Sequence, residues 1–278
     1  MNIKYLSREL CPPCIWKFIK RIRQSFQPPP EDQLEFRGNY LSWAEAVAMC
    51  NGYAAPVILE RTRAAILKVR NGEAVFERDS VIFDQPQYAL PMLSALGRAA
   101  LNNSGKLSVL DFGGSLGSTY FQTKSFFGRA VSIDWAVVEQ PTVVECGQRE
   151  FQTSELRFYH SLDEAVAQQF PDVLLLSGVL QYLPAPHGVL ASMLQLGIKH
   201  VIVDRTPFLY SGRDRLTIQH VPANIYLADY PAWVFDEKKL TTVFVAGGYR
   251  CIAEFPGFDS ISLRDEPAYF KGFVLEKI

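Results

Sequence analysis

The sequence predicts an α/β fold built on a doubly wound, mostly parallel β-sheet, preceded by an N-terminal helical extension. From Lys106 onward, short apolar segments with strand character alternate with helical segments, a pattern typical of a sheet with helices on both faces. Three of the apolar segments end in a carboxylate, at Asp111, Glu139 and Asp204. The last two expected strands are joined without a helix, so we expect one of them to run antiparallel.

The composition is typical of a globular protein of ordinary charge. Of 278 residues, 48% are hydrophobic and 21% are charged, which excludes disorder, collagen and coiled coil as overall descriptions. A net charge of −1 gives no indication of a nucleic-acid partner. The apolar runs fall far short of the ~20 residues that a membrane-spanning helix needs. Five cysteines, an odd number, indicate reduced thiols and therefore a cytoplasmic location.

Residues 1–30 are expected to form a basic leader and a proline-rich linker. Residues 1–26 hold six basic side chains and one acidic one, and an apolar stripe at helical spacing begins at Ile15. Such a helix either docks on its own domain or makes weak contact with an anionic membrane surface. Cys11 and Cys14 have no further metal ligands near them in the sequence, so no metal site is predicted.

Residues 31–105 are predicted to form a helical region that covers the mouth of the following domain. Ser42 and Glu45 form a capping box for a helix over 43–49. Two further periodic stretches predict helices over 56–70 and 91–101. No strand of comparable strength is expected in this region.

Residues 106–278 are predicted to form the sheet domain. Its strands are expected at 107–111, 135–139, 156–159, 172–177, 200–204, 249–255 and 270–277. Helices are expected from the end of the first strand to residue 127, after residue 161, and over 236–246. The strand over 172–177 is the most apolar, as in a strand buried on both faces. The stretch over 205–233 is expected to be irregular.

A glycine-rich turn follows the first strand of this domain, at residues 113–117. A dinucleotide-binding fingerprint would place glycines at Phe112, Gly114 and Gly117, so its first glycine is missing. Asp111 adds a negative charge beside the turn, which disfavours a pyrophosphate and favours a cationic ligand such as S-adenosylmethionine. Because ligands of such sheets bind at the carboxyl ends of the strands, we expect the site at this turn.

Three segments resemble motifs of the class I S-adenosylmethionine-dependent methyltransferases, which have a Rossmann-like fold. Residues 109–117 are similar to their first motif, residues 137–141 to their second, and residues 172–183 to their fourth-strand segment. The third segment, together with residues 203–207, resembles a bacterial methyltransferase family associated with surface-polysaccharide gene clusters. The turn lacks the middle glycine of the usual pattern, and the acid of the second motif is Glu139 rather than aspartate.

The resemblance implies a site for S-adenosylmethionine along the strand ends. Glu139 is implied to accept both ribose hydroxyls, and Asp111 to lie near the ammonium group; Asp134 is the alternative acid for the ribose. A further set of residues is implied to contact the donor, namely Gly113, Gly114, Ser115, Gly117, Gln140, Leu162, Ser177, Gly178 and Val179.

Catalytic and acceptor-binding groups are expected at the end of the fifth strand and in the stretch after it. His220 is the best-placed base for a hydroxyl nucleophile, and Asp204 and Arg205 are the other candidate catalytic residues. Arg205, Arg213 and Arg215 are candidates for holding a carboxylate or phosphate of the acceptor. We therefore expect O-methylation of a small molecule or of a sugar or polysaccharide precursor, in the cytoplasm or at the inner surface of the membrane.

Two other functions stay open at this stage. The first is a non-catalytic module that binds the donor or a partner. The second is an oxidoreductase with a nucleotide cofactor on a related fold, against which the missing glycine argues. The sequence predicts neither the acceptor nor the oligomeric state.

Overall fold

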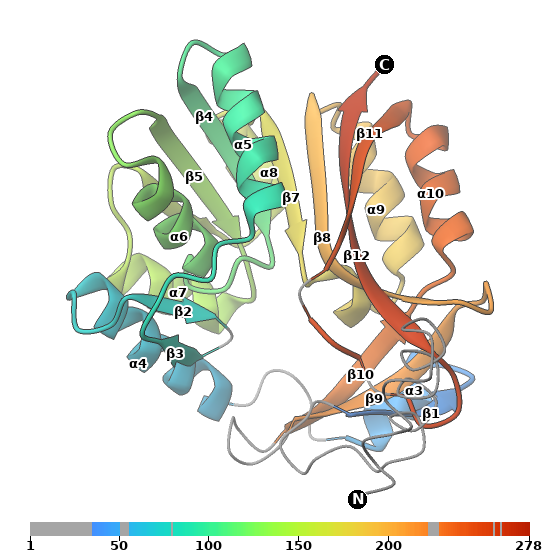
Figure 1. Ribbon diagram of the computed structural model, residues 1–278. Helices are drawn as coiled ribbons and strands as arrows, with labels where there is room; N and C mark the ends of the chain where they lie inside the picture. Colours follow the sequence, from blue (N-terminus) through green and yellow to red (C-terminus); the bar gives the residue numbers. More distant parts are fainter. Residues whose placement is uncertain (1–34, 51–55, 79, 222–227, 258, 262) are drawn as a thin grey trace, which may run out of the picture.

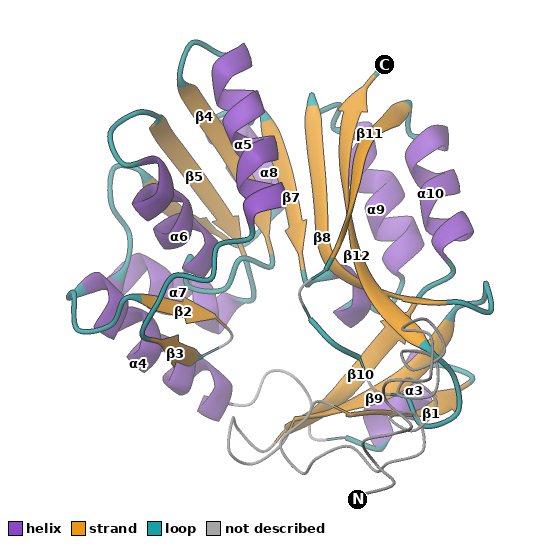
Figure 2. Ribbon diagram, viewed as in Figure 1, coloured by secondary structure: helices purple, strands orange, loops and turns teal. Residues whose placement is uncertain are grey.

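A seven-stranded sheet in the order β11-β12-β8-β7-β4-β5-β6 forms the centre of the protein. The computed structural model describes residues 35–50, 56–78, 80–221, 228–257, 259–261 and 263–278. Helices cover both faces of the sheet (Figures 1 and 2). The strands of this sheet are β4 (Lys106–Phe112), β5 (Ser132–Val138), β6 (Leu156–Tyr159), β7 (Val173–Ser177), β8 (His200–Leu209), β11 (Tyr249–Pro256) and β12 (Ala268–Lys277).

The strand directions confirm the predicted fold class. β4 pairs in parallel with β5 and β7, β5 with β6, and β7 with β8. The last strand, β12, runs antiparallel to both of its neighbours, β8 and β11. The sheet is therefore mostly parallel with a final antiparallel strand.

Two apolar cores lie on opposite faces of the sheet, and β7 contributes to both. Val173 and Leu175 pack in one core, while Leu174 and Leu176 pack in the other. Successive side chains of a strand point to opposite faces, so a run of four apolar residues is what a doubly covered strand requires. The prediction that this strand is buried on both faces is confirmed.

Helices follow the strands in the expected alternation. They are α6 (Ser118–Phe127), α7 (Pro141–Glu150), α8 (Leu162–Gln168), α9 (Pro186–Gln195) and α10 (Glu237–Ala246), with a short 3-10 helix, η1 (Leu180–Tyr182). α8 begins as predicted, because the side chain of Ser161 accepts a hydrogen bond from the backbone N–H of Glu164 at 3.2 Å. Each helix thus starts close to the carboxyl end of the preceding strand.

The N-terminal region contains the three predicted helices and also three strands. α3 (Trp43–Ala48), α4 (Pro56–Arg70) and α5 (Leu90–Asn102) confirm the helices. The expectation of helices alone is wrong, because β1 (Glu35–Tyr40), β2 (Phe76–Arg78) and β3 (Val81–Phe83) also form. β2 and β3 are too short for a clear local pattern, and β1 pairs with a strand far along the chain.

Most of the described residues after residue 204 form strands, which corrects the expectation of an irregular stretch. β8 continues to Leu209 because β12 pairs along it. β9 (Arg215–Val221) and β10 (Ala228–Val234) then form a second sheet in the order β1-β9-β10. Its first pairing joins Glu35 to His220. This small sheet lies below the carboxyl ends of the central strands in Figure 1.

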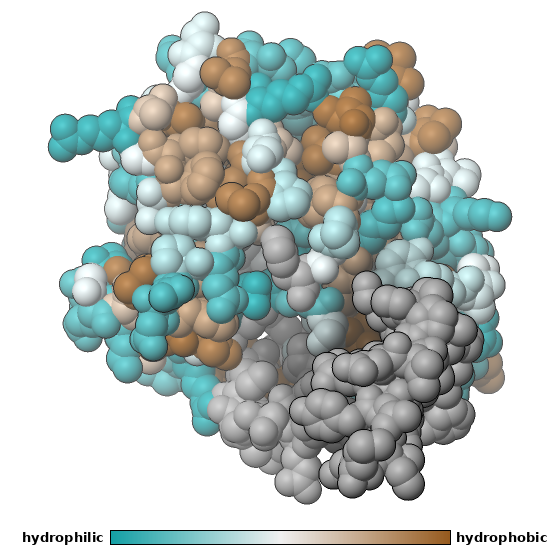
Figure 3. All heavy atoms as spheres, viewed as in Figure 1, coloured by the Kyte–Doolittle hydropathy of each residue, from teal (hydrophilic) through white to brown (hydrophobic). Residues whose placement is uncertain are grey.

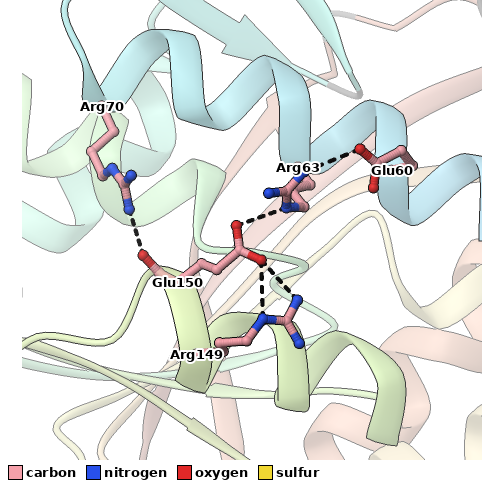
Figure 4. A network of polar contacts seen from close by, with 5 residues as sticks. All are labelled: Glu60, Arg63, Arg70, Arg149 and Glu150. Carbon is pink, nitrogen blue, oxygen red and sulfur yellow. Dashed lines mark hydrogen bonds and ion pairs between the residues drawn. The ribbon is translucent and has the colours of Figure 1, made fainter.

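A polar network joins α4 of the N-terminal region to α7 of the sheet domain (Figure 4). Arg63 Nε donates to Glu150 Oε2 at 2.7 Å, and Arg63 also pairs with Glu60 at 3.1 Å. Arg70 donates to the backbone carbonyl of Glu150, and Arg149 pairs with the Glu150 carboxylate. The glutamate is mostly buried, so this cluster fixes α4 against the sheet domain.

The basic leader and the Cys11–Cys14 element lie outside the described residues. Within the residues that the structure does describe, no helix is long and apolar enough to cross a membrane. On the face drawn in Figure 3, hydrophobic and hydrophilic residues are interspersed over the central sheet and its helices.

Candidate functional site

A cavity of about 300 Å³ lies at the carboxyl ends of β4 and β7 and beside β8. This volume is at the lower end of the range of small-molecule sites. One side of the cavity is formed by predicted donor-binding residues: Asp111, Gly113, Gly114, Ser115, Ser177 and Gly178. The other side is formed by residues of the small sheet and of the β2–β3 hairpin. The structure therefore brings six of the eleven predicted donor residues to one cavity.

Asp111 is the most deeply buried acid of the site, with 1% of its surface exposed. Its Oδ2 accepts a hydrogen bond from Trp135 Nε1 at 3.1 Å. Burial raises the pKa of Asp111 to about 7; the Trp135 bond opposes this rise and the charge of Glu139 adds to it. Because the carboxylate is buried, water would screen its electrostatic attraction to a neighbouring cation only weakly.

The glycine turn packs directly against Asp111 and Val179. A Cβ at Gly114 would lie 2.4 Å from Asp111 Oδ2, and one at Gly113 would lie 2.4 Å from Val179 Cγ2. The glycines are thus needed for the turn's own packing. Ser115 lines the cavity in the left-handed region at φ 53°, a conformation that costs a non-glycine residue free energy and is concentrated at functional sites.

Glu139 lies behind this turn and is not among the residues that line the cavity. Its Oε1 accepts a hydrogen bond from the backbone N–H of Ser115 at 3.2 Å, and its Oε2 accepts one from Gln140 N at 2.7 Å. Burial raises the pKa of Glu139. The carboxylate therefore holds the loop that lines the cavity, and of Glu139 and Ser115 only Ser115 lines the cavity itself.

Four other predicted donor contacts also lie outside the cavity lining. Gly117 precedes α6 with φ 89°, and Gln140 is exposed at the start of α7. Leu162 packs at the edge of a core as the first residue of α8, and Val179 is buried behind Gly113. The roles predicted for these four residues stay predictions.

Asp204 and Arg205 line the cavity on β8, beside the end of β7. Asp204 is 2% exposed, and burial raises its pKa, whereas the neighbouring Arg205 charge lowers it. Arg205 adopts φ 52°, and its Nε donates to Asp259 Oδ2 at 2.6 Å. A buried carboxylate with a raised pKa at the wall of a cavity is suited to accept a proton.

His220, the predicted base, is not among the residues that line the cavity. Its neighbours Gln219 and Val221 both line the cavity, and successive residues of a strand point to opposite faces. Burial and the charge of Arg37 lower the pKa of His220. The position of the imidazole therefore gives no support to the predicted role, which stays a prediction.

Arg213 and Arg215 are also placed away from the cavity. Arg213 donates to Glu266 Oε2 at 2.9 Å, and Arg215 donates to Asp265 Oδ1 at 2.9 Å. Neither arginine is among the lining residues. Of the three arginines considered for holding the acceptor, only Arg205 is positioned to do so.

Several cavity residues were not predicted as site residues. Glu77 and Arg78 come from the β2–β3 hairpin, and Gln219 and Tyr230 come from the small sheet. These segments were expected to be helical or irregular, so no local signal placed them at the site. Gln181 was visible as a strand-end residue in the third resembling segment but was not chosen.

No cluster of three or more histidine, cysteine, aspartate or glutamate side chains able to hold a metal ion occurs among the described residues. The carboxylates and backbone groups that line the cavity suit an organic cation. Gly113 and Gly114 leave no side chain between the turn and the cavity, so the residues present fit a ligand with a positive charge.

The structure is similar to solved S-adenosylmethionine-dependent methyltransferases. Magnesium protoporphyrin IX methyltransferase of Synechocystis PCC 6803, solved with S-adenosylmethionine, has a TM-score of 0.44 and 12% identity over 68% of this chain and 79% of its own. For 1,6-didemethyltoxoflavin-N1-methyltransferase of Burkholderia thailandensis, solved with S-adenosylhomocysteine, the TM-score is 0.42, with 18% identity over 87% of this chain and 99% of its own.

A third solved structure is the N-terminal domain of EvdMO1 with S-adenosylhomocysteine and D-fucose. Its TM-score is 0.42, with 14% identity over 76% of this chain and 94% of its own. No family model and no curated protein matches the sequence. Likenesses this distant do not identify a reaction, so the chemistry of the cavity has to be derived from this chain's own residues.

Proposed function

We propose that the protein is an S-adenosylmethionine-dependent methyltransferase that acts on a hydroxyl group of a small-molecule acceptor. The observation that carries this proposal is the contact between the buried Asp111 carboxylate and Gly114 in a cavity at the strand ends. Asp111 thus provides a negative charge in the lining of the cavity, and Gly114 beside it exposes backbone without a side chain. A sulfonium compound with an ammonium group and no phosphate fits this combination.

The proposed donor-binding roles are supported by the position of six of these residues in the lining of one cavity. Asp111 faces the ammonium group, and the turn from Gly113 to Ser115 lies against the donor's amino-acid part and ribose. Glu139 is proposed to accept the ribose hydroxyls at the edge of the loop that it anchors, and Ser177 and Gly178 are proposed to supply backbone carbonyls. We also propose contacts with the donor for Gly117, Gln140, Leu162 and Val179. When bound, S-adenosylmethionine would supply an activated methyl group whose carbon an oxygen nucleophile can attack, with the thioether sulfur of S-adenosylhomocysteine as the leaving group.

Asp204 is the proposed base in place of His220. It is buried, it lines the cavity, and burial raises its pKa, which makes it a stronger base than an ordinary aspartate. Arg205 holds the adjacent wall through Asp259. Alignment of the two reactants in a water-poor cavity provides about 7–11 kcal/mol of the barrier reduction in comparable reactions, so positioning is the main task of these residues.

The acceptor class and the location are proposed from the resemblance of the sequence. We propose a sugar or polysaccharide precursor as acceptor, in the cytoplasm, with weak contact of residues 1–26 with the inner membrane surface.

We propose that the chain divides into a leader and linker (1–30), a cap region (31–105) and a donor-binding domain (106–278). Deletion of residues 1–26 should leave donor affinity unchanged and reduce binding to vesicles that contain anionic lipid. Loss of donor affinity would place the leader at the site.

Calorimetric titration of the full chain with S-adenosylhomocysteine and with NAD tests the proposed function. We expect binding of S-adenosylhomocysteine, no binding of NAD, and loss of at least about tenfold in affinity for Asp111→Asn. Glu145→Gln, on the exposed side of α7, is the control and should bind as the unsubstituted protein does. Binding of NAD alone would favour an oxidoreductase. Binding of the donor product without methyl transfer to any hydroxylated acceptor would favour a non-catalytic module.

A further inference from the structure

Gln181 carries a buried amide oxygen that has no hydrogen-bond partner. Only three buried side-chain polar atoms in the described part of the chain lack a partner, and they belong to Thr123, Arg157 and Gln181. Of these three residues only Gln181 lines the cavity, and it is 3% exposed. Leaving a buried acceptor unpaired costs free energy, so such an atom at a ligand site needs a reason.

The orientation of the Gln181 amide is fixed by a second interaction. Its Nε2 donates to the backbone carbonyl of Arg205 at 3.2 Å. Arg205 is in turn held in the left-handed region at φ 52°, with its N–H bonded to Asp204 Oδ1 at 2.8 Å. Because the nitrogen is used in this way, a flip of the amide would replace a donor by an acceptor against a carbonyl. The oxygen is therefore the atom left for a ligand.

The surroundings of Gln181 belong to the acceptor side of the cavity. It follows the donor-binding residues of β7 and precedes Tyr182, whose hydroxyl donates to Gln219 Oε1 at 2.9 Å. Gln219 Nε2 donates to the Tyr230 hydroxyl at 3.3 Å, and the rings of Tyr182 and Tyr230 meet edge to face at 5.3 Å. All four residues line the cavity. Aromatic faces beside amide groups suit a ring that also offers hydrogen bonds.

We propose that Gln181 is a specificity-determining residue that accepts a hydrogen bond from a second hydroxyl of the acceptor. The preferred acceptor is then a ring with at least two hydroxyl groups, one facing Asp204 and the other facing Gln181. This inference rests on the proposed methyl transfer and specifies its substrate class. An acceptor with a single hydroxyl leaves the Gln181 oxygen unpaired, and a site of this kind rejects such an analogue.

Matched pairs of small ring alcohols test this proposal on the full chain saturated with S-adenosylhomocysteine. The pairs are catechol with phenol and cyclohexane-1,2-diol with cyclohexanol, and they separate a planar aromatic ring from a saturated one. We expect at least one diol to bind about three- to tenfold more tightly than its single-hydroxyl partner, as one hydrogen bond in a buried site allows. In Gln181→Leu this preference should fall to about twofold or less, with S-adenosylhomocysteine affinity unchanged.

Two further variants keep the result interpretable. Gln148→Leu removes an amide that donates to the carbonyl of Phe158 at 3.0 Å outside the cavity, and it should keep the diol preference. Gln181→Met replaces the leucine variant if that protein does not fold. The proposal is overturned if no diol is preferred, if no ring binds, or if Gln181 variants keep the preference. Loss of S-adenosylhomocysteine binding in Gln181→Leu would place Gln181 on the donor side, which also overturns it. Failure of the unsubstituted protein to bind S-adenosylhomocysteine at all would instead refute the proposed function.

Discussion

The carboxylate of Glu139 accepts a hydrogen bond from the backbone N–H of Ser115 at 3.2 Å and so joins the end of β5 to the loop after β4. Ser115 lies in the left-handed region, where a side chain is unfavourable, and this bond helps to hold it there. Glu139 is therefore coupled to the cavity even though it does not line it. The shape of the glycine turn thus depends on an acid that follows the neighbouring strand.

Substitution of this acid should weaken donor binding without unfolding the protein. In Glu139→Ala, the loop loses its anchor and the ribose loses its acceptor, so we expect S-adenosylhomocysteine affinity to fall by about tenfold or more in calorimetry. Circular dichroism should be unchanged. Asp134→Ala, which removes the alternative acid, should have little effect on the affinity. Unchanged binding in Glu139→Ala would remove this residue from the site.

Donor affinity should depend on pH because of Asp111. Burial raises the pKa of this carboxyl to about 7 in the free protein, and a bound cation lowers it again because it stabilises the charged form. Binding therefore releases a proton below pH 7. The affinity for S-adenosylhomocysteine should be constant from about pH 8 until the ligand's own ammonium group loses its proton, and it should fall by up to about tenfold per unit below pH 7. Calorimetry between these limits, in two buffers of different ionisation enthalpy, measures the proton released.

Asp111→Asn provides the control for this dependence and adds a stability test. The variant should show a flat pH profile of donor affinity at a weak level. In the unsubstituted protein the folded pKa lies above the ordinary value of 3.8, so the stability contributed by the protonated group is lost as pH rises through about 7. At pH 8 the asparagine variant should thus be more stable, by about 2–4 kcal/mol in urea denaturation. A less stable variant would contradict the raised pKa.

The elements of the sheet domain were predictable from sequence because their signals are local. Four successive apolar residues ending at Leu176 define β7, and Ser161 with Glu164 defines the start of α8. The acids at Asp111 and Asp204 stand out because each follows a buried run, and both line the cavity. Such signals require no knowledge of the partner strand.

The part of the cavity formed by the small sheet and the β2–β3 hairpin was not predictable from sequence, because it depends on contacts between distant segments. Glu35 pairs with His220 across most of the chain, and the pattern of either strand alone is too short to show this. His220 was chosen by residue type, whereas the strand's alternation directs Gln219 toward the cavity instead. Glu77 and Arg78 reach the cavity from a hairpin of two three-residue strands, which leaves no periodic signal.

Gly114 should not tolerate a side chain. A Cβ at this position lies 2.4 Å from Asp111 Oδ2, so alanine pushes the loop away from the carboxylate. We expect Gly114→Ala to cost about 1–3 kcal/mol of unfolding free energy and to abolish measurable donor binding. Gly188→Ala is the matched control, because nothing lies within 4 Å of its Cβ and it sits in α9, where alanine is favoured by about 0.4–1 kcal/mol. If the two variants had the same free energy of unfolding and the same donor affinity, the turn would be able to accommodate a side chain, and the prediction would be wrong.

Asp214 should stabilise the protein in acid because it ties α9 to the start of α10. Burial alone raises its pKa, but hydrogen bonds from His187 at 3.1 Å, Asp236 N at 2.8 Å and Lys239 at 3.2 Å lower the pKa to about 2. The folded value lies below the ordinary 3.8, so the contribution is present above about pH 4 and is lost as pH falls through about 2.

The expected size of this contribution is about 2 kcal/mol at neutral pH. Urea denaturation of Asp214→Asn should show a loss of this order at pH 7 that shrinks toward pH 2.5. Lys239→Ala should cost less than about 1 kcal/mol, because the lysine side chain is 58% exposed and its pairing is screened by water. If the asparagine variant lost the same stability at both pH values, packing rather than the charge of Asp214 would hold the two helices together.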